Sequence, residues 1–177
     1  MKRQIARDEG LSLIELVVVI AIMGVLISLV AISVSVVTRQ KVSNAASDVK
    51  GILQTAQTIA MSKDNCHVEI QKINGAVVFT TYSSSSKTID KVTLDKKITV
   101  NISYQTGASS NIDVLGAVGI YYDRTTGAFA DNAYVCGTTG DPKTTGTAVN
   151  TIRWIEFSNG SKSVRLHLTK LTGKVSY

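Results

Sequence analysis

The stretch of sequence that decides the fold of this 177-residue chain runs from Gly10 to Val37 and reads GLSLIELVVVIAIMGVLISLVAISVSVV. Between Gly10 and Arg39 the only charged residue is Glu15. The run is longer than the roughly 20 apolar residues that a helix needs to cross the hydrocarbon core of a bilayer. Residues 11–37 are therefore predicted to form a transmembrane helix.

Residues 1–10 form a leader that carries three basic side chains. A secretory signal places its small-residue cleavage site after the apolar run, whereas here the small residue, Gly10, comes before it. A cut after Gly10 would remove the leader and keep the helix. Glu15 would then lie about one turn inside the new N-terminus, and an ionisable side chain in a membrane segment usually marks a functional site.

This arrangement resembles the cleavage and methylation motif of type IV prepilins and pseudopilins over residues 1–37. The resemblance implies that a membrane-embedded prepilin peptidase cuts after Gly10 and methylates the new amino terminus at Leu11. It also implies that Glu15 meets the amine of a neighbouring subunit during assembly. Leucine at position 11 departs from the commoner phenylalanine, and no proline lies near Ile32. The alternative is an ordinary single-pass anchor with an accidental glutamate.

The helix is predicted to continue past the apolar run, because residues 38–64 change to an amphipathic pattern. Apolar residues at spacings of three and four mark one face of a helix: Val42, Ala45, Ala46, Val49, Ile52, Leu53, Ala56, Ile59 and Ala60. Proline does not interrupt the join. We therefore expect one helix over about residues 12–63, which Asp64 and Asn65 end.

From residue 65 to 177 the pattern is that of a β-rich globular domain. Two β-prone runs flank Asn74-Gly75, which is a strong hairpin signal. Strands are expected at 67–71, 76–82, 89–94, 98–104, 118–122, 152–157, 164–168 and 175–177. Residues 105–111 are expected to form a loop, and 137–146 are the longest irregular stretch. One long helix followed by strands predicts an α+β fold with an antiparallel sheet packed on the upper helix.

This order matches the pilin-like fold that the resemblance implies. The passage from Ala56 to Ile70 also resembles the minor pseudopilin or minor pilin branch of the family, as does the ending from Ser163 to Val175.

The composition agrees with an exported domain of net charge +6 that holds two cysteines, Cys66 and Cys136. An exported location permits a disulfide between them. The alternative is two buried thiols, which behave as small hydrophobic side chains. Neither cysteine has a second one nearby, so a zinc site is not expected.

No catalytic constellation stands out in the sequence, and we expect no enzyme activity, cofactor or metal. The two histidines, His67 and His167, lie on separate expected strands. A lone histidine on a strand is more often a surface or half-buried residue than a base or a ligand. The catalysis around this chain would belong to the peptidase that cuts it.

Three functions remain open at this stage. The chain is expected to be a major or minor subunit of a type IV pilus, or a pseudopilin of a type II secretion machine. The third is a competence-type minor pilin that binds DNA through basic residues near the C-terminus, with Trp154 and Tyr177 stacking on bases. Those basic residues are Arg153, Lys162, Arg165, Lys170 and Lys174. A solvated basic face is the favoured reading of the set.

The expected partners are other pilin subunits, the prepilin peptidase and the membrane. The expected location is the cytoplasmic membrane before assembly, followed by a surface or periplasmic filament.

Overall fold

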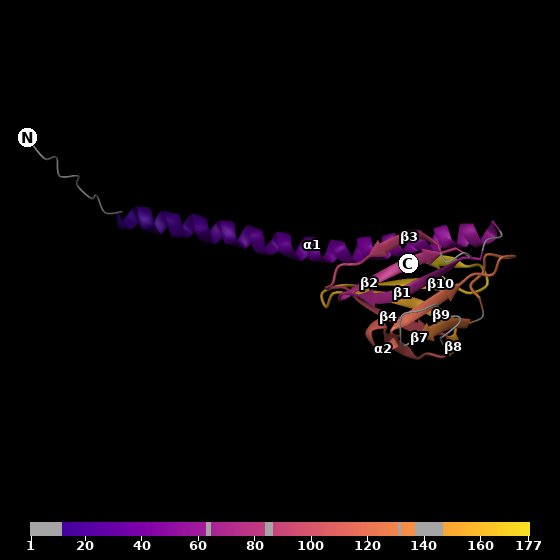
Figure 1. The fold of residues 1–177 in the computed structure, drawn as a ribbon. Coiled ribbons are helices and arrows are strands. Elements are labelled where there is room, and N and C mark those ends of the chain that lie inside the picture. Colours follow the sequence, from indigo (N-terminus) through magenta and orange to yellow (C-terminus); the bar gives the residue numbers. More distant parts are fainter. Residues whose placement is uncertain (1–11, 63–64, 84–86, 131, 137–146) are drawn as a thin grey trace, which may run out of the picture. The chain divides into compact units, whose positions relative to one another are not determined.

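The computed structural model describes residues 12–62, 65–83, 87–130, 132–136 and 147–177, without the side chains of 29–35, 132, 136 and 150. The chain divides into two compact units, residues 1–38 and 39–177. A single 49-residue helix, α1 (Leu13–Met61), contributes to both units (Figure 1). The helix expected over residues 12–63 is therefore confirmed within two residues at its end. The predicted stop at Asp64 lies outside the described residues.

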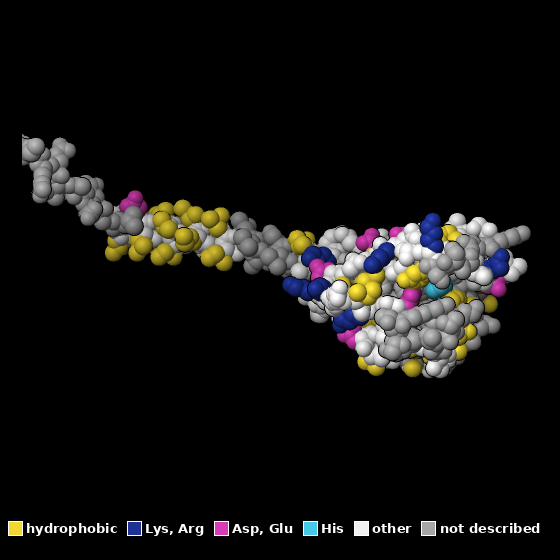
Figure 2. Space-filling model, viewed as in Figure 1, with side chains coloured by type: hydrophobic (Ala, Val, Ile, Leu, Met, Phe, Trp, Pro, Cys, Tyr) yellow, Lys and Arg dark blue, Asp and Glu magenta, His cyan; other side chains and the backbone are white. Residues whose placement is uncertain are grey.

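The first part of α1 exposes apolar side chains (Figure 2). The large side chains from Leu13 to Ile27 are each between 45% and 81% exposed, and they include five consecutive positions, 16–20. Consecutive exposed positions cover every face of a helix, so this surface is apolar all round. Within the residues that the structure describes, no helix is long and apolar enough to cross a membrane. The expected span over 11–37 includes position 11 and the side chains of 29–35, which lie outside the described set.

The later part of α1 packs on the globular domain through the predicted apolar face. The face is confirmed, because Ile59 is partly buried and its other eight residues are at most 5% exposed. Four of those eight are alanines, whose small side chains allow the helix to approach the strands closely. The buried residues are Val42, Ala45, Ala46, Val49, Ile52, Leu53, Ala56 and Ala60.

The strands of the described part form two antiparallel sheets. The six-stranded sheet has the order β3-β2-β1-β6-β7-β8, and the five-stranded sheet has the order β11-β10-β9-β4-β5. The strands are β1 (His67–Ile73), β2 (Ala76–Tyr82), β3 (Thr88–Thr93), β4 (Thr99–Tyr104), β5 (Ser109–Asn111), β6 (Ala117–Tyr121), β7 (Asn132–Cys136), β8 (Thr147–Asn150), β9 (Ile152–Ser158), β10 (Ser163–Thr169) and β11 (Lys174–Ser176).

The α+β class is confirmed, but the expectation of one sheet is wrong. The inward faces of both sheets meet the later part of α1 in one hydrophobic core. Phe79 of β2 and Phe157 of β9 contact each other across that core, with ring centroids 6.1 Å apart. Alternation along a strand reveals that one face is buried, but it does not reveal which strands become neighbours.

The expected hairpin between β1 and β2 is confirmed. Its turn residues both have positive φ, 51° at Asn74 and 82° at Gly75. These values suit the mirror-image turn that matches the twist of paired strands. Ile73 pairs with Ala76 directly across the turn.

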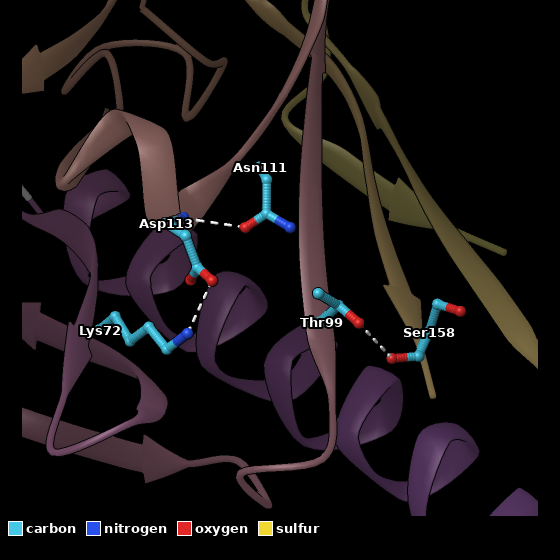
Figure 3. Close-up of polar contacts among 5 residues, drawn as sticks. All are labelled: Lys72, Thr99, Asn111, Asp113 and Ser158. Atoms are coloured by element: carbon cyan, nitrogen blue, oxygen red, sulfur yellow. Dashed lines mark hydrogen bonds and ion pairs between the residues drawn. The ribbon is translucent and has the colours of Figure 1, made fainter. Parts of the chain in front are cut away.

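The expected loop over 105–111 is wrong at its end, because Ser109–Asn111 pairs with β4 as β5. A short helix that the sequence did not predict, α2 (Ile112–Leu115), follows at once. Asn111 caps it by accepting a hydrogen bond from the Asp113 backbone N–H at 2.9 Å, and Lys72 pairs with the Asp113 carboxylate at 2.7 Å (Figure 3). Strands β7 and β8 were also not predicted.

The far end of α1 is fixed to the domain by side-chain hydrogen bonds to backbone carbonyls. The Gln57 amide Nε2 donates to the carbonyl of Gly127 at 3.0 Å and to that of Thr172 at 2.8 Å. The Tyr122 hydroxyl donates to the Leu53 carbonyl at 2.8 Å. These bonds join α1 to the turn after β6 and to the turn between β10 and β11.

Candidate processing and assembly site at the start of the long helix

The candidate site lies at the first turn of α1, where Ser12 precedes the helix. The Glu15 backbone N–H donates to Ser12 Oγ at 3.3 Å, and the Ser12 backbone N–H donates to Glu15 Oε2 at 3.4 Å. The Leu16 N–H donates to the Ser12 carbonyl at 3.2 Å, which makes Ser12 the N-cap of the helix. This reciprocal pair is a capping box, in which a serine and a glutamate three residues later satisfy two backbone donors that the helix leaves unpaired.

The capping box gives the Glu15 carboxylate a defined place. The partial positive charge of a helix N-terminus favours a carboxylate there, and the Ser12 N–H supplies one further donor. Gly10 and Leu11, the expected processing residues, lie outside the described residues. In sequence, the bond between them is the second peptide bond before the N-cap.

The two cysteines are held apart by the backbone of the six-stranded sheet. Cys66 is buried just before β1. The backbone of Cys136 lies opposite Ala117 of β6, and Ala117 lies opposite Gln71 of β1. Gln71 is five residues along the chain from Cys66, which is roughly 16 Å along the strand, in addition to two strand spacings. A disulfide needs Cα atoms within about 7 Å, so this register does not bring the two residues together.

The basic residues considered for DNA binding lie on the neighbouring strands β9, β10 and β11 and in the turns that join them. Arg153 lies on β9, Arg165 on β10 and Lys174 on β11, while Lys162 and Lys170 lie in the turns on either side of β10. Arg165 and Lys162 make side-chain contacts within the chain. The Arg165 guanidinium bonds the Glu156 carboxylate at 2.9 Å and lies over the Trp154 ring at 4.8 Å. The Lys162 ammonium donates to Ser43 of α1 at 2.6 Å.

The histidines are separated, as expected. His67 stacks between Tyr82 and Tyr121, with ring centroids 5.3 and 4.9 Å apart, and Tyr134 meets Tyr121 edge-on. His167 is exposed on β10. Among the described residues, no group of three or more His, Cys, Asp or Glu side chains is placed to hold a metal ion.

Sequence reasoning singled out Glu15 but not its capping partner. The serine three residues before a glutamate, directly ahead of an apolar run, was a readable signal for Ser12. Gln57 is not part of the predicted apolar face of the helix, and nothing local in the sequence reveals that it bonds carbonyls 70 and 115 residues away.

A helix with an apolar first half and a carboxylate in its first turn, followed by an antiparallel β domain, is a pilin-like α+β architecture. Residues 5–35 match the family model described as the prokaryotic N-terminal methylation motif. The chain therefore carries the N-terminal motif of type IV prepilins and pseudopilins, as the resemblance indicated. No curated protein and no solved structure matches the chain.

Proposed function

We propose that this protein is a structural subunit of a type IV pilus or pseudopilus. It is cut by prepilin peptidase after Gly10, methylated at Leu11 and assembled through α1. The observation that carries the proposal is the Glu15 carboxylate in the first turn of an apolar helix, inside the residues that match the methylation motif. Proteins with this motif are structural subunits rather than enzymes.

Before assembly the subunit rests in the membrane. The apolar run continues from Leu13 to Val37 in sequence, and its described side chains surround the helix. Lys2, Arg3 and Arg7 hold the leader on the cytoplasmic side, because basic residues near a membrane span favour that side. The β domain is then on the outside.

In assembly, the helix exchanges lipid for the helices of other subunits, and Glu15 changes partner. In the single chain, the carboxylate has a long hydrogen bond from Ser12 at 3.4 Å. The methylated amine of a neighbour offers a full positive charge, and such a pair at 4 Å is worth about 4 kcal/mol at an effective dielectric near 20. A buried charge without a partner is costly, so this pair selects the register in which subunits dock.

The experiment compares processing with assembly in Glu15 variants. Glu15→Gln and Glu15→Ala are expected to be cut and methylated normally but to give few or no filaments in sheared-filament and secretion assays. Asp48→Asn is the matched control, because Asp48 is an exposed carboxylate on the later part of the same helix. Normal filament numbers in the Glu15 variants would contradict the proposed role of the carboxylate.

A further inference from the structure

Lys and Arg side chains gather at the end of the globular unit where its part of α1 begins, with acidic side chains beside them (Figure 2). We call this set the basic collar; it consists of Arg39, Lys41, Lys96, Lys97 and Lys162. Three segments of the chain supply it: the helix, the turn between β3 and β4, and the turn between β9 and β10. The fold, and not a run of sequence, brings these charges together.

Side-chain contacts fix the collar on both sides of the helix. The Lys41 ammonium pairs with the Asp95 carboxylate at 2.7 Å, and the other oxygen of Asp95 accepts the Lys97 backbone N–H at 3.0 Å. The turn that carries Lys96 and Lys97 is thereby held at the level of Lys41. On the other side, the Lys162 ammonium donates to Ser43.

Arg39 completes the set, because it lies one helical turn before Ser43 on the same side of α1. Asp95 is the single carboxylate that these contacts include, so the collar keeps a strong positive charge. Arg39, Lys96 and Lys97 are all exposed.

We propose that the basic collar binds the anionic headgroups of the membrane in which the subunit rests before assembly. This inference rests on the membrane-inserted state of the proposed function. The apolar run ends at Val37, so Arg39 and Lys41 follow it within four residues. Anionic headgroups attract Lys and Arg side chains that lie near a membrane surface, which here is the outer surface on the side of the β domain. The attraction extends over a Debye length of about 8–10 Å.

Long basic side chains suit this role, because their stems lie along apolar surface while the charged ends reach the phosphates. The bound partner is a phospholipid phosphate in a bilayer. Before assembly, the collar holds the domain against the membrane surface. It releases the lipid when the subunit enters a filament.

The experiment measures acylation of individual lysines in the full chain by mass spectrometry. The chain is reconstituted in nanodiscs of phosphatidylcholine alone or with added phosphatidylglycerol. Acylation of Lys96 and Lys97 is expected to slow at least about threefold in the anionic discs, and high salt is expected to remove the effect. Lys87 and Lys91, exposed lysines before and on β3, serve as controls in the same molecule.

Two triple variants test whether the collar residues bind lipid together. Both variants keep Lys41 and Lys162, and the acylation rates of these two lysines are measured. The triple variant Arg39→Gln, Lys96→Gln, Lys97→Gln is expected to lose the protection of Lys41 and Lys162 by anionic lipid. The matched variant Lys87→Gln, Lys91→Gln, Lys174→Gln removes the same number of positive charges. In this variant, anionic lipid is expected to protect Lys41 and Lys162 as in the native chain. If the chain is inserted and Lys96 and Lys97 are acylated at the same rate in both kinds of disc, the collar proposal is overturned. The proposed function would not be affected by that result.

Two further outcomes would overturn the lipid proposal for other reasons. A chain that does not float with uncharged vesicles is not inserted, which would overturn the membrane step of the proposed function and this inference with it. Salt-sensitive DNA binding that only the collar variant loses, without protection by anionic discs, would assign the collar to nucleic acid and overturn the lipid proposal.

Discussion

Ser12 and Glu15 bond each other across the first turn of α1, each side chain accepting from the other residue's backbone N–H, at 3.3 and 3.4 Å. The pair fixes where the helix begins, and the processing residues Gly10 and Leu11 lie just before that point in sequence. One carboxylate therefore has two uses: it caps its own helix in the single chain, and we propose that it pairs with a neighbour's amine in the filament.

The first prediction concerns the cap. Ser12→Ala removes the side-chain acceptor, and loss of an N-cap costs about 0.5–2 kcal/mol of helix stability. The amides of residues 13–16 are therefore expected to exchange hydrogen faster in the variant, whereas Ser12→Thr is expected to keep the native rate. Unchanged exchange in Ser12→Ala would show that the capping box does not hold the first turn.

The second prediction concerns Gln57, whose amide bonds the carbonyls of Gly127 and Thr172. Gln57→Ala leaves both carbonyls without this donor and is expected to lower the free energy of unfolding by about 1–2 kcal/mol. Gln54→Ala is the matched control one turn earlier on the exposed face, and it is expected to stay within about 0.5 kcal/mol of the native value. Chemical denaturation measures both, and equal losses would refute the role of Gln57.

The third prediction concerns the close approach of two turns beneath the end of α1. Gly173 has a φ of +63°, and a Cβ added there would lie 2.1 Å from the Gly127 carbonyl oxygen. Gly160 has a similar φ of +82° but open space around it. Gly160→Ala is expected to cost about 1–2 kcal/mol from the backbone alone. Gly173→Ala should cost clearly more, because the backbone of the neighbouring turn must move.

Denaturation of the two alanine variants side by side tests this packing. If Gly173→Ala were no worse than Gly160→Ala, the two turns would not be in contact.

The fourth prediction concerns alkaline pH. Burial raises the pKa of Tyr104 to about 12. Burial, with a smaller contribution from Cys66, also raises the pKa of Tyr122 well above its usual value of 10.0. A tyrosine whose pKa is higher in the folded state binds its proton more tightly there. Its contribution to stability is complete below pH 10 and is lost as the pH rises toward the folded value.

The free energy of unfolding is therefore expected to fall above about pH 10, and the fall should be smaller in Tyr104→Phe. That variant is also expected to fold well, because the Tyr104 hydroxyl has no hydrogen-bond partner among the described residues. A phenolate absorbance titration in which all six tyrosines ionise together near pH 10 would contradict these shifted pKa values.

The parts of the fold that could be predicted are those that depend on residues close together in the sequence. The spacing of Val42, Ala46, Val49 and Leu53 gave the buried face of α1, since a helix brings residues three and four apart to one side. Asn74-Gly75 gave the hairpin, because few other residue pairs accept positive φ at both turn positions.

The parts that the sequence did not reveal depend on distant partners. β5 consists of Ser109, Ser110 and Asn111, which lack apolar alternation and become a strand only through pairing with β4. The division into two sheets depends likewise on which strands pair, and many of the paired strands are far apart in the sequence. The motif around Glu15 at the candidate site could be recognised in the sequence. The basic collar of the globular unit could not, because it joins residues from three separate segments.

The most direct test of the central claim is the mass of the N-terminal peptide from the membrane-extracted protein, with and without prepilin peptidase. The account predicts a chain that begins at N-methylated Leu11 when the peptidase is present and keeps its leader when it is absent. A chain that retains Met1 in the presence of the peptidase, or one that is cut after Val37, would contradict it.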